Sequence, residues 1–206
     1  MTKYKMIDLC SGLKGASQPF IDCPDWEVFT IDINPILDPD LCIDIIELSK
    51  ILEEIKEVPT EDITLIWASP ECIEFYKVLA PFHKDDYGNE PDMSLVNACL
   101  KIIDFINPKY WVLENTQSGS IFIKKILGNY RQKLGPFFLW GNFPLLNCKV
   151  DKKHKYNNDT WSDNPLRSNI KAKLPYEVGE NLRNNITNQN SLESWGLFVE
   201  EEYYQP

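Results

Sequence analysis

Short apolar runs of strand length alternate with helix-length segments along the chain, and this alternation limits the fold more than any other feature. Residues 63–68 form the clearest run, apolar apart from Thr64, which predicts a strand in the centre of a sheet. Other runs predict strands over residues 4–9, 27–31, 41–43, 110–113 and 137–140. Apolar residues at helical spacing predict helices over residues 45–56, 93–105 and 176–188. The expected fold class is α/β, a mostly parallel sheet with helices on both faces.

The length of the chain favours one compact core. A chain of 206 residues, 43% of them hydrophobic, is long enough for one sizeable core and short for two, so we expect a single domain over residues 1–206. No run approaches the roughly 18 apolar residues of a membrane span, and the first residues lack the form of a signal peptide. The six cysteines are scattered without C-x-x-C spacing, which indicates free thiols rather than disulfides or zinc ligands. We therefore expect an intracellular, cytoplasmic protein without a metal site.

The balance of charge bears on nucleic-acid partners. A formal net charge of -10 argues against nonspecific coating of nucleic acid, because such affinity comes from Lys and Arg side chains that neutralise phosphates. Residues 149–173 differ from the rest of the chain, since Lys and Arg outnumber Asp there and aromatic residues lie among them. Lys152, Lys153 and Arg167 in this segment are candidate contacts to a phosphate backbone. Charge alone is equally compatible with a solvated loop.

Polar residues follow several of the predicted strands, at the edge where an open parallel sheet holds its ligand. The turn from Asp8 to Gly15 follows the first strand, and its two glycines allow a ligand to approach the backbone closely. Asp32 follows the second strand, where nucleoside-binding sheets place an acid that accepts hydrogen bonds from ribose hydroxyls. Either feature alone also suits an ordinary turn or helix cap, whereas the two together favour nucleoside binding.

Cys72 follows the central strand through Ser69 and Pro70, and this position predicts a partly exposed thiol at the rim of the same crevice. Such a thiol can act as a nucleophile if its thiolate is favoured, although a semi-buried structural cysteine would look the same in sequence. Glu114 and Asn115 follow the next strand, and a carboxyl group in a closed pocket can donate a proton to a ring nitrogen. A thiol and an acid are the groups needed to activate a pyrimidine ring.

The order of these motifs resembles that of the DNA cytosine-5 methyltransferases, and the similarity is best to the compact members found in phages and archaea. Residues 8–15 (DLCSGLKG) are similar to the family's cofactor loop, D-L-F-x-G-x-G-G. Residues 68–72 (ASPEC) are similar to its nucleophile motif P-P-C, and residues 114–116 (ENT) to its acid motif E-N-V. Residues 139–144 look like a late strand of the compact members, and residues 167–182 look like their closing motif. The resemblance covers nearly the whole chain.

The resemblance implies a Rossmann-like class I S-adenosylmethionine-dependent methyltransferase fold, and transfer of a methyl group to C5 of a flipped cytosine in DNA through a covalent adduct with Cys72. Glu114 would bind ring N3, Asp32 the cofactor ribose and Asp44 the adenine amino group. The catalytic candidates are Cys72, Glu114 and Asn115. The cofactor-binding candidates are Asp8, Leu9, Cys10, Ser11, Gly12, Gly15, Asp32, Ile33, Asp44, Ile45, Ser69, Pro70 and Asn169. The substrate-binding candidates are Arg131, Lys133, Lys152, Lys153 and Arg167.

Departures from the family pattern bear on activity and specificity. Glu71 replaces the second proline and puts a negative charge beside the nucleophile, which disfavours its thiolate, and Thr116 is unusual after Glu-Asn. Because there is no room for a large recognition domain, we expect residues 135–173 to form a reduced recognition segment and residues 174–206 to return to the catalytic core. Sequence recognition would then be limited, or supplied by a partner subunit. Two alternatives stay open: RNA as the substrate, and a noncatalytic cofactor- or nucleic-acid-binding homologue that acts as a regulator or subunit.

Overall fold

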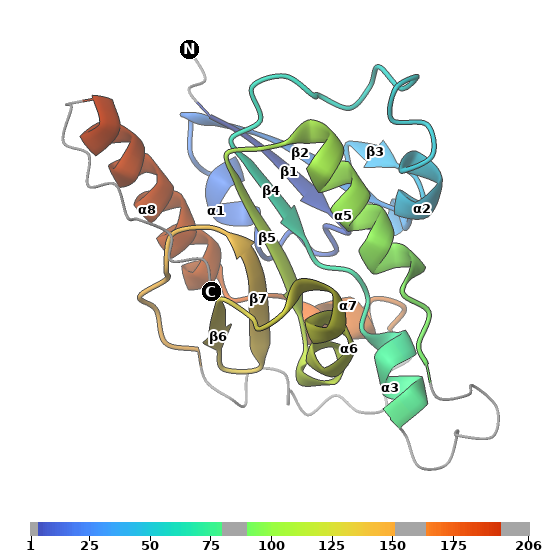
Figure 1. Cartoon of the computed structure of the whole chain (residues 1–206). Coiled ribbons are helices and arrows are strands. Elements are labelled where there is room, and N and C mark those ends of the chain that lie inside the picture. Colours follow the sequence, from blue (N-terminus) through green and yellow to red (C-terminus); the bar gives the residue numbers. More distant parts are fainter. Residues whose placement is uncertain (1–3, 80–89, 151–163, 195–206) are drawn as a thin grey trace.

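The computed structural model describes residues 4–79, 90–150 and 164–194, which form a sheet flanked by helices (Figure 1). The strands are β1 (Tyr4–Leu9), β2 (Trp26–Asp32), β3 (Leu41–Cys42), β4 (Leu65–Ala68), β5 (Tyr110–Asn115), β6 (Gln132–Leu134) and β7 (Phe137–Asn142). The α-helices are α1 (Gln18–Ile21), α2 (Ile45–Leu48), α3 (Ile73–Leu79), α5 (Ser94–Ile106), α6 (Gln117–Leu127), α7 (Arg167–Ala172) and α8 (Tyr176–Ser194). A short 3-10 helix, Pro35–Leu37, follows β2.

The seven strands are ordered β3-β2-β1-β4-β5-β7-β6. Every pair from β3 to β5 is parallel, whereas β7 is antiparallel to both of its neighbours. A hairpin of β6 and β7 therefore extends the parallel part of the sheet beyond β5. The architecture is the α/β fold that the sequence pattern predicted, a mostly parallel sheet with helices on both faces.

Alternation along the strands divides the core into two clusters, one on each face of the sheet. The first core cluster contains Ile7 of β1 and Ile66 of β4, packed against α2, α3, α5 and α6. The second core cluster contains Met6 of β1 and Leu65 of β4, packed against α1 and α8. Both faces of the central strands are thus covered, which explains why β4 reads as a continuous apolar run in the sequence.

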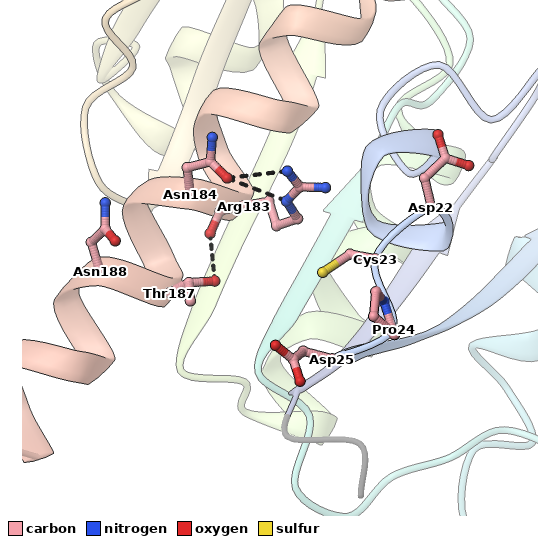
Figure 2. A pocket seen from close by; sticks show the side chains of 8 residues that line it. All are labelled: Asp22, Cys23, Pro24, Asp25, Arg183, Asn184, Thr187 and Asn188. Carbon is pink, nitrogen blue, oxygen red and sulfur yellow. Dashed lines mark hydrogen bonds between the residues drawn. The ribbon is translucent and has the colours of Figure 1, made fainter.

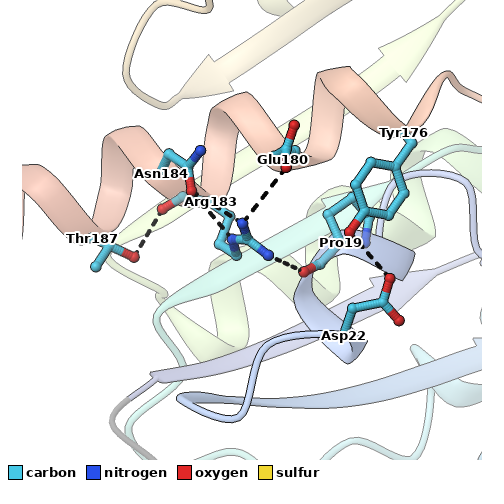
Figure 3. Close-up of polar contacts among 7 residues, drawn as sticks. All are labelled: Pro19, Asp22, Tyr176, Glu180, Arg183, Asn184 and Thr187. Atoms are coloured by element: carbon cyan, nitrogen blue, oxygen red, sulfur yellow. Dashed lines mark hydrogen bonds and ion pairs between the residues drawn. The ribbon is translucent and has the colours of Figure 1, made fainter.

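Helix α8 is fixed to α1 by polar contacts as well as by the second core cluster (Figure 3). The Arg183 guanidinium donates to the Pro19 carbonyl and to the Asn184 amide oxygen, and the Tyr176 hydroxyl donates to an Asp22 carboxylate oxygen over 3.1 Å. A Cβ atom on Gly179 would lie 2.3 Å from the Ala16 carbonyl oxygen, so glycine is needed for α8 to come this close. This packing positions the segment that follows β1.

One predicted helix is much shorter than its apolar spacing indicated. The prediction over residues 45–56 is wrong beyond Leu48, where α2 ends. The Ser49 hydroxyl donates to the Ile46 carbonyl over 2.8 Å, and the Lys50 amide bonds to a carbonyl three residues back instead of four. These bonds draw the chain into tight turns, while the apolar side chains that follow still reach the first core cluster.

The other predicted elements exist, with shifted ends. Strand β5 continues two residues beyond Leu113, through Glu114 and Asn115, and β7 likewise continues to Asn142. Helices α3, α6 and α7 and strand β6 were not among the predicted elements. Among the described residues, no helix is long and apolar enough to cross a membrane.

Candidate active site

The register of the sheet gathers the candidate residues at one edge. Ile31, Leu9, Ala68 and Leu113 are paired in one row across β2, β1, β4 and β5. The residues that follow them are Asp32, Cys10, Ser69 and Glu114. These four residues therefore form one line across the carboxyl ends of the parallel strands. We call this line the carboxyl edge. It is the position at which open parallel sheets bind ligands.

The loop after β1 is held in an unusual conformation. Cys10, Gly12 and Lys14 all have positive φ angles, of 57°, 52° and 55°. The Ser11 amide bonds to the Ile31 carbonyl over 3.1 Å, which ties the loop to β2. Leu9 is fully buried in the first core cluster, so only its backbone can face a ligand. The loop therefore presents mainly backbone groups at the carboxyl edge.

Two contacts bring the segment around α7 to this loop. A Cβ atom on Gly12 would lie 3.7 Å from Nδ2 of Asn169, so the candidate Asn169 lies beside the loop. A Cβ atom on Gly15 would lie 2.6 Å from the Leu174 amide nitrogen, which leaves no room for a side chain. The two glycines thus permit close contact with residues that are more than 150 positions away in the sequence.

Asp32 connects two loops through its carboxylate and is 8% exposed. One oxygen accepts the Gly12 amide over 2.8 Å, and the other accepts the Asn34 amide over 2.9 Å. A carboxylate has about four acceptor positions, so acceptor capacity is left for further donors. The arrangement suits an acid that receives ribose hydroxyls next to the β1 loop.

Asp8 is buried beneath the loop, with 1% of its surface exposed. Burial raises the pKa of Asp8 from 3.8 to about 7, against the opposing effect of a hydrogen bond from the Ser17 hydroxyl. The nearby Asp32 carboxylate raises the pKa further, and Lys14 lowers it. Asp8 thus carries a proton over a wider pH range than an ordinary aspartate and supports the loop from within the protein.

Cys10 and Ser11 occupy adjacent positions with different surroundings. A hydrogen bond with the Cys99 side chain, together with burial, raises the pKa of the Cys10 thiol, so Cys10 is a neutral thiol next to the first core cluster. Ser11 is 7% exposed, and its hydroxyl has no hydrogen-bond partner among the described residues. Burying a hydroxyl group without a hydrogen-bond partner costs free energy. This fits a loop in which a bound ligand supplies the missing partner.

The candidates near β3 differ in what they offer. Ile33 is 62% exposed and presents an apolar surface directly after Asp32. Asp44 caps α2 by accepting the Ile46 amide over 2.8 Å. Ile45 is buried in the first core cluster, so its side chain faces away from the crevice and only its backbone remains as a possible contact.

The segment that carries Cys72 is fixed on the side nearest β4. The Ser69 amide donates to the Leu9 carbonyl over 3.1 Å, and the Ser69 hydroxyl accepts the Trp67 indole N–H over 2.7 Å. Pro70 is buried, Glu71 is exposed and Cys72 is half-buried next to the first core cluster. The thiol therefore lies between core and solvent, while the acidic side chain beside it is in water.

Asn115 joins the end of β5 to the Cys72 segment. Its Nδ2 donates to the Pro70 carbonyl over 2.9 Å, and its Oδ1 accepts the Thr116 amide over 2.9 Å. Asn115 is 2% exposed and the adjacent Glu114 is 6% exposed, so both side chains are withdrawn from solvent. Both ends of the Asn115 amide are thus used within the protein, whereas Glu114 supplies a buried carboxyl group at the carboxyl edge.

The cationic candidates are not brought together. The Arg131 side chain donates to the Phe143 carbonyl over 2.8 Å and stacks on the Phe143 ring of the second core cluster. Lys133 Nζ lies 4.4 Å from the centre of the Phe138 ring, which belongs to the first core cluster on the other face. Arg167 begins α7, which buries none of its residues. Lys152 and Lys153 lie outside the described residues.

A surface pocket lies at the opposite edge of the sheet, between residues 22–25 and α8 (Figure 2). The Tyr4 amide bonds to the Asp25 carbonyl over 3.1 Å, so this pocket is at the amino ends of β1 and β2. We call this side the amino edge. Asp22 and Asp25 are exposed there, and the Arg183 side chain is occupied by its contacts with α1. The pocket contains none of the predicted site residues.

Several functional positions were missed at the level of the sequence. Ser17 supports Asp8, and Gly119 leaves space for the Asn115 side chain. Ser17 stands at the N-cap position of α1, but its hydroxyl donates to Asp8 instead of accepting from the helix amides. Nothing in the sequence indicated the contact at Gly119. Among the described residues, no group of three or more His, Cys, Asp or Glu side chains is arranged to hold a metal ion.

Comparison with known proteins gives one curated relative. The chain is 23% identical over 125 residues to a protein described as a probable DNA (cytosine-5)-methyltransferase of Frog virus 3 (isolate Goorha). The aligned part covers 56% of this chain and 55% of that protein, so the chain spans about half the length of the relative it matches. No protein-family model matches the chain.

Two solved structures show a weaker likeness. A putative DNA modification methyltransferase encoded within an E. coli prophage is 17% identical with a TM-score of 0.44, covering 68% of this chain and 46% of that one. The Entamoeba histolytica methyltransferase EhMeth is 16% identical with a TM-score of 0.40, covering 73% of this chain and 56% of that one. Likenesses at this level do not distinguish one function from another. The description of the viral relative agrees with the resemblance of the motif order to that of the DNA cytosine-5 methyltransferases.

Proposed function

We propose that the chain is an S-adenosylmethionine-dependent methyltransferase that modifies C5 of cytosine in DNA, with Cys72 as its nucleophile and Glu114 as its acid. The observation that carries the proposal is the Asn115 to Pro70 hydrogen bond of 2.9 Å, which links the strand end bearing Glu114 to the segment bearing Cys72. A thiol and a buried carboxyl group at one edge of the sheet are what activation of a pyrimidine ring requires. The viral relative's description agrees with this substrate.

The residues of the carboxyl edge fit a nucleoside cofactor. Asp32 would accept the ribose hydroxyls, and the exposed Ile33 would cover one face of the adenine. The Ser11 hydroxyl and the backbone around Gly12 would bind the methionine end, where the buried hydroxyl still lacks a partner among the described residues. Asp44 would contact the adenine end of the cofactor. Asn169 would contact the cofactor beside the β1 loop. S-adenosylmethionine, when bound, supplies the methyl group that is transferred.

In the proposed reaction, the Cys72 thiolate forms a bond to C6 of a cytosine that has left the base stack. Glu114, as a protonated acid, donates a hydrogen bond to N3, which stabilises the negative charge that develops on the ring. C5 then takes up the methyl group. Loss of the C5 proton to water restores the ring double bond and breaks the bond between sulfur and C6, so Cys72 is released unchanged.

Substrate contacts are proposed for the part of residues 135–173 that follows β7, because residues 137–142 belong to the sheet. Lys133 lies opposite Phe138, which is itself paired with Asn115, so its ammonium group is close to the carboxyl edge and suited to a phosphate contact. Arg131 is held by Phe143 and would act by fixing the hairpin. A partner subunit would supply any further sequence recognition, and residues 174–194 complete the domain against α1.

The decisive experiment is covalent trapping. The protein and labelled S-adenosylmethionine are incubated with duplex DNA, single-stranded DNA or RNA containing 5-fluorocytosine, and adducts are resolved on denaturing gels. Fluorine at C5 cannot leave as a proton does, so an active enzyme stays bound to its substrate. We expect an adduct with duplex DNA that is lost in Cys72→Ser and kept in Cys23→Ser, a second half-buried cysteine at the amino edge.

Each other outcome has a defined meaning. An adduct that persists in Cys72→Ser would reject Cys72 as the nucleophile. An adduct on RNA alone would move the substrate class to RNA. Measurable cofactor binding without an adduct on any substrate would support the noncatalytic alternative.

A further inference from the structure

Helix α6 contains a glycine where glycine is unfavourable. Gly119 is the third residue of α6 and is buried. In a helix, glycine is less favourable than alanine because its backbone loses more conformational freedom. Gly119 is not among the glycines with positive φ, so its backbone conformation is one that any residue adopts. The reason for glycine at this position therefore lies in the space around it.

A side chain at position 119 would collide with Asn115. A Cβ atom there would lie 2.0 Å from Oδ1 and 2.6 Å from Cγ of Asn115, and 3.0 Å from Cδ2 of Phe75. Real Cβ atoms essentially never come this close to another heavy atom. The first collision is with a short side chain whose amide is hydrogen-bonded at both ends, so it has little freedom to move.

The space above Gly119 is where three elements meet. Asn115 at the end of β5 reaches across it to the Pro70 carbonyl, two residues before Cys72. Phe75, three residues after Cys72, stacks on Phe122 of α6 with ring centres 5.8 Å apart. The segment with Cys72 is thus held on both sides by contacts that pass next to Gly119.

We infer that Gly119 is a positioning residue for Cys72: the absence of a side chain lets Asn115 reach Pro70 and fix the backbone that carries the thiol. The consequence for catalysis rests on the proposed function, but the placement itself is testable on the protein alone. Asn115 has the same role in this arrangement, since its amide groups bond to backbone rather than to substrate.

The test compares Gly119→Ala with Ser120→Ala, a change at the next position of the same helix. Helix propensity alone predicts that Gly119→Ala stabilises the protein. The inference predicts the opposite, because the Asn115 amide must give up its bond to Pro70. NMR of the Asn115 side-chain amide, identified by its absence in Asn115→Ala, should show exchange with solvent about tenfold faster in Gly119→Ala, the change expected for loss of one buried hydrogen bond. Ser120→Ala should leave it unchanged.

Activity provides a second readout. We expect the rate of 5-fluorocytosine adduct formation to fall about tenfold in Gly119→Ala, with the dissociation constant of S-adenosylmethionine within twofold of the parent, because a displaced Cys72 segment weakens the chemistry and leaves the Asp32 side intact. Alkylation of Cys72 by iodoacetamide, followed by mass spectrometry, should change its rate in the same variant.

The double variant Asn115→Ala/Gly119→Ala distinguishes the mechanism from general damage. With the Asn115 amide absent, the added methyl group at 119 should cost little more, so the two effects should be strongly non-additive. Full additivity, or an unchanged Asn115 amide signal in Gly119→Ala, would overturn the inference. If Gly119→Ala does not fold, recovery of folding in the double variant supports the collision, and failure to recover rejects it. If Gly119→Ala alters the amide signal but the parent protein forms no adduct, the proposed function is rejected and the positioning role of Gly119 stands.

Discussion

The carboxyl edge and the amino edge of the sheet both carry clusters of polar side chains, but these side chains are buried at the carboxyl edge and exposed at the amino edge. At the carboxyl edge, Asp8, Asp32, Glu114 and Asn115 are between 1% and 8% exposed. At the amino edge, Asp22 and Asp25 are exposed, and the Arg183 contacts serve to attach α8 to α1 (Figures 2 and 3). Burying a polar group costs free energy unless it is bonded, whereas an exposed one costs almost nothing.

The difference in burial distinguishes the candidate functional site at the carboxyl edge from the surface pocket at the amino edge. Most polar groups at the carboxyl edge are buried, although burial costs free energy and the fold does not require polar groups there. Their burial points to a role in binding or chemistry. The amino edge has the more evident hollow, yet its charges are solvated and its one arginine is committed to packing. Substitutions at Asp8, Asp32 and Arg183 test whether the two edges differ in this way.

The largest expected effect is the pH dependence that Asp8 adds at the carboxyl edge. Because the pKa of Asp8 is raised to about 7, the folded protein keeps a proton that the unfolded chain loses above its ordinary pKa of 3.8. The resulting stabilisation is complete below the unfolded pKa and is lost as the pH rises through about 7. Asp8→Asn mimics the neutral acid and should remove this loss, worth up to about 4 kcal/mol in the free energy of unfolding.

Urea unfolding of the parent and of Asp8→Asn across this pH range checks the prediction. The free-energy difference between the two proteins should grow in favour of the variant as the pH rises. Asp25→Asn, an exposed acid at the amino edge, should show no such trend. A constant difference between Asp8→Asn and the parent at all pH values would contradict the prediction.

The second effect concerns cofactor affinity at Asp32. Asp32→Asn keeps the size of the side chain but removes the charge and one acceptor, so the Gly12 and Asn34 amides can no longer both be satisfied as they are now. We expect the dissociation constant of S-adenosylmethionine, measured by calorimetry, to rise about 10- to 100-fold, the effect of losing one or two hydrogen bonds to a charged group. Asp25→Asn should leave it unchanged, and an equal effect of both variants would abolish the distinction between the edges.

The smallest effect is expected at the amino edge. Arg183→Met keeps the aliphatic stem but removes the donors to Pro19 and Asn184. The free energy of unfolding should fall by about 1–2 kcal/mol, while cofactor affinity stays within twofold. A tenfold loss of affinity in this variant would show that the packing of α8 on α1 is coupled to the carboxyl edge.

Much of the parallel sheet could be predicted from the sequence. Strand β4 is buried on both faces, so it reads as an unbroken apolar run, and β1 has a shorter apolar pattern that Lys5 and Asp8 interrupt. The polar residues after these strands mark the ligand edge. Position after a strand was enough to select Asp32, Ser69 and Glu114 as neighbours, because parallel strands bring their carboxyl ends to one edge.

The remaining features depend on contacts between distant residues. Helix α6 has Ser118 and Gly119 in its first turn, two residues that disfavour a helix, and packing through Phe122 and Ile123 compensates for them. The pairing of Asn115 with Pro70 spans 45 positions, and no local pattern encodes it. Arg131 and Lys133 are two residues apart, yet the structure puts their side chains on opposite faces, which spacing in an irregular hairpin could not reveal.

The composition of the second core cluster also has a consequence for biosynthesis. Met6, Phe20 and Trp67 are translated early, but Val178, Leu182 and Ile186, which cover them, leave the ribosome last among the described helices. A nascent chain therefore lacks the cover that α8 gives to this face of its sheet until Ile186 has been made, and exposed apolar surface of this kind favours aggregation. The β1 loop acquires its contact between Gly15 and Leu174 at the same late stage.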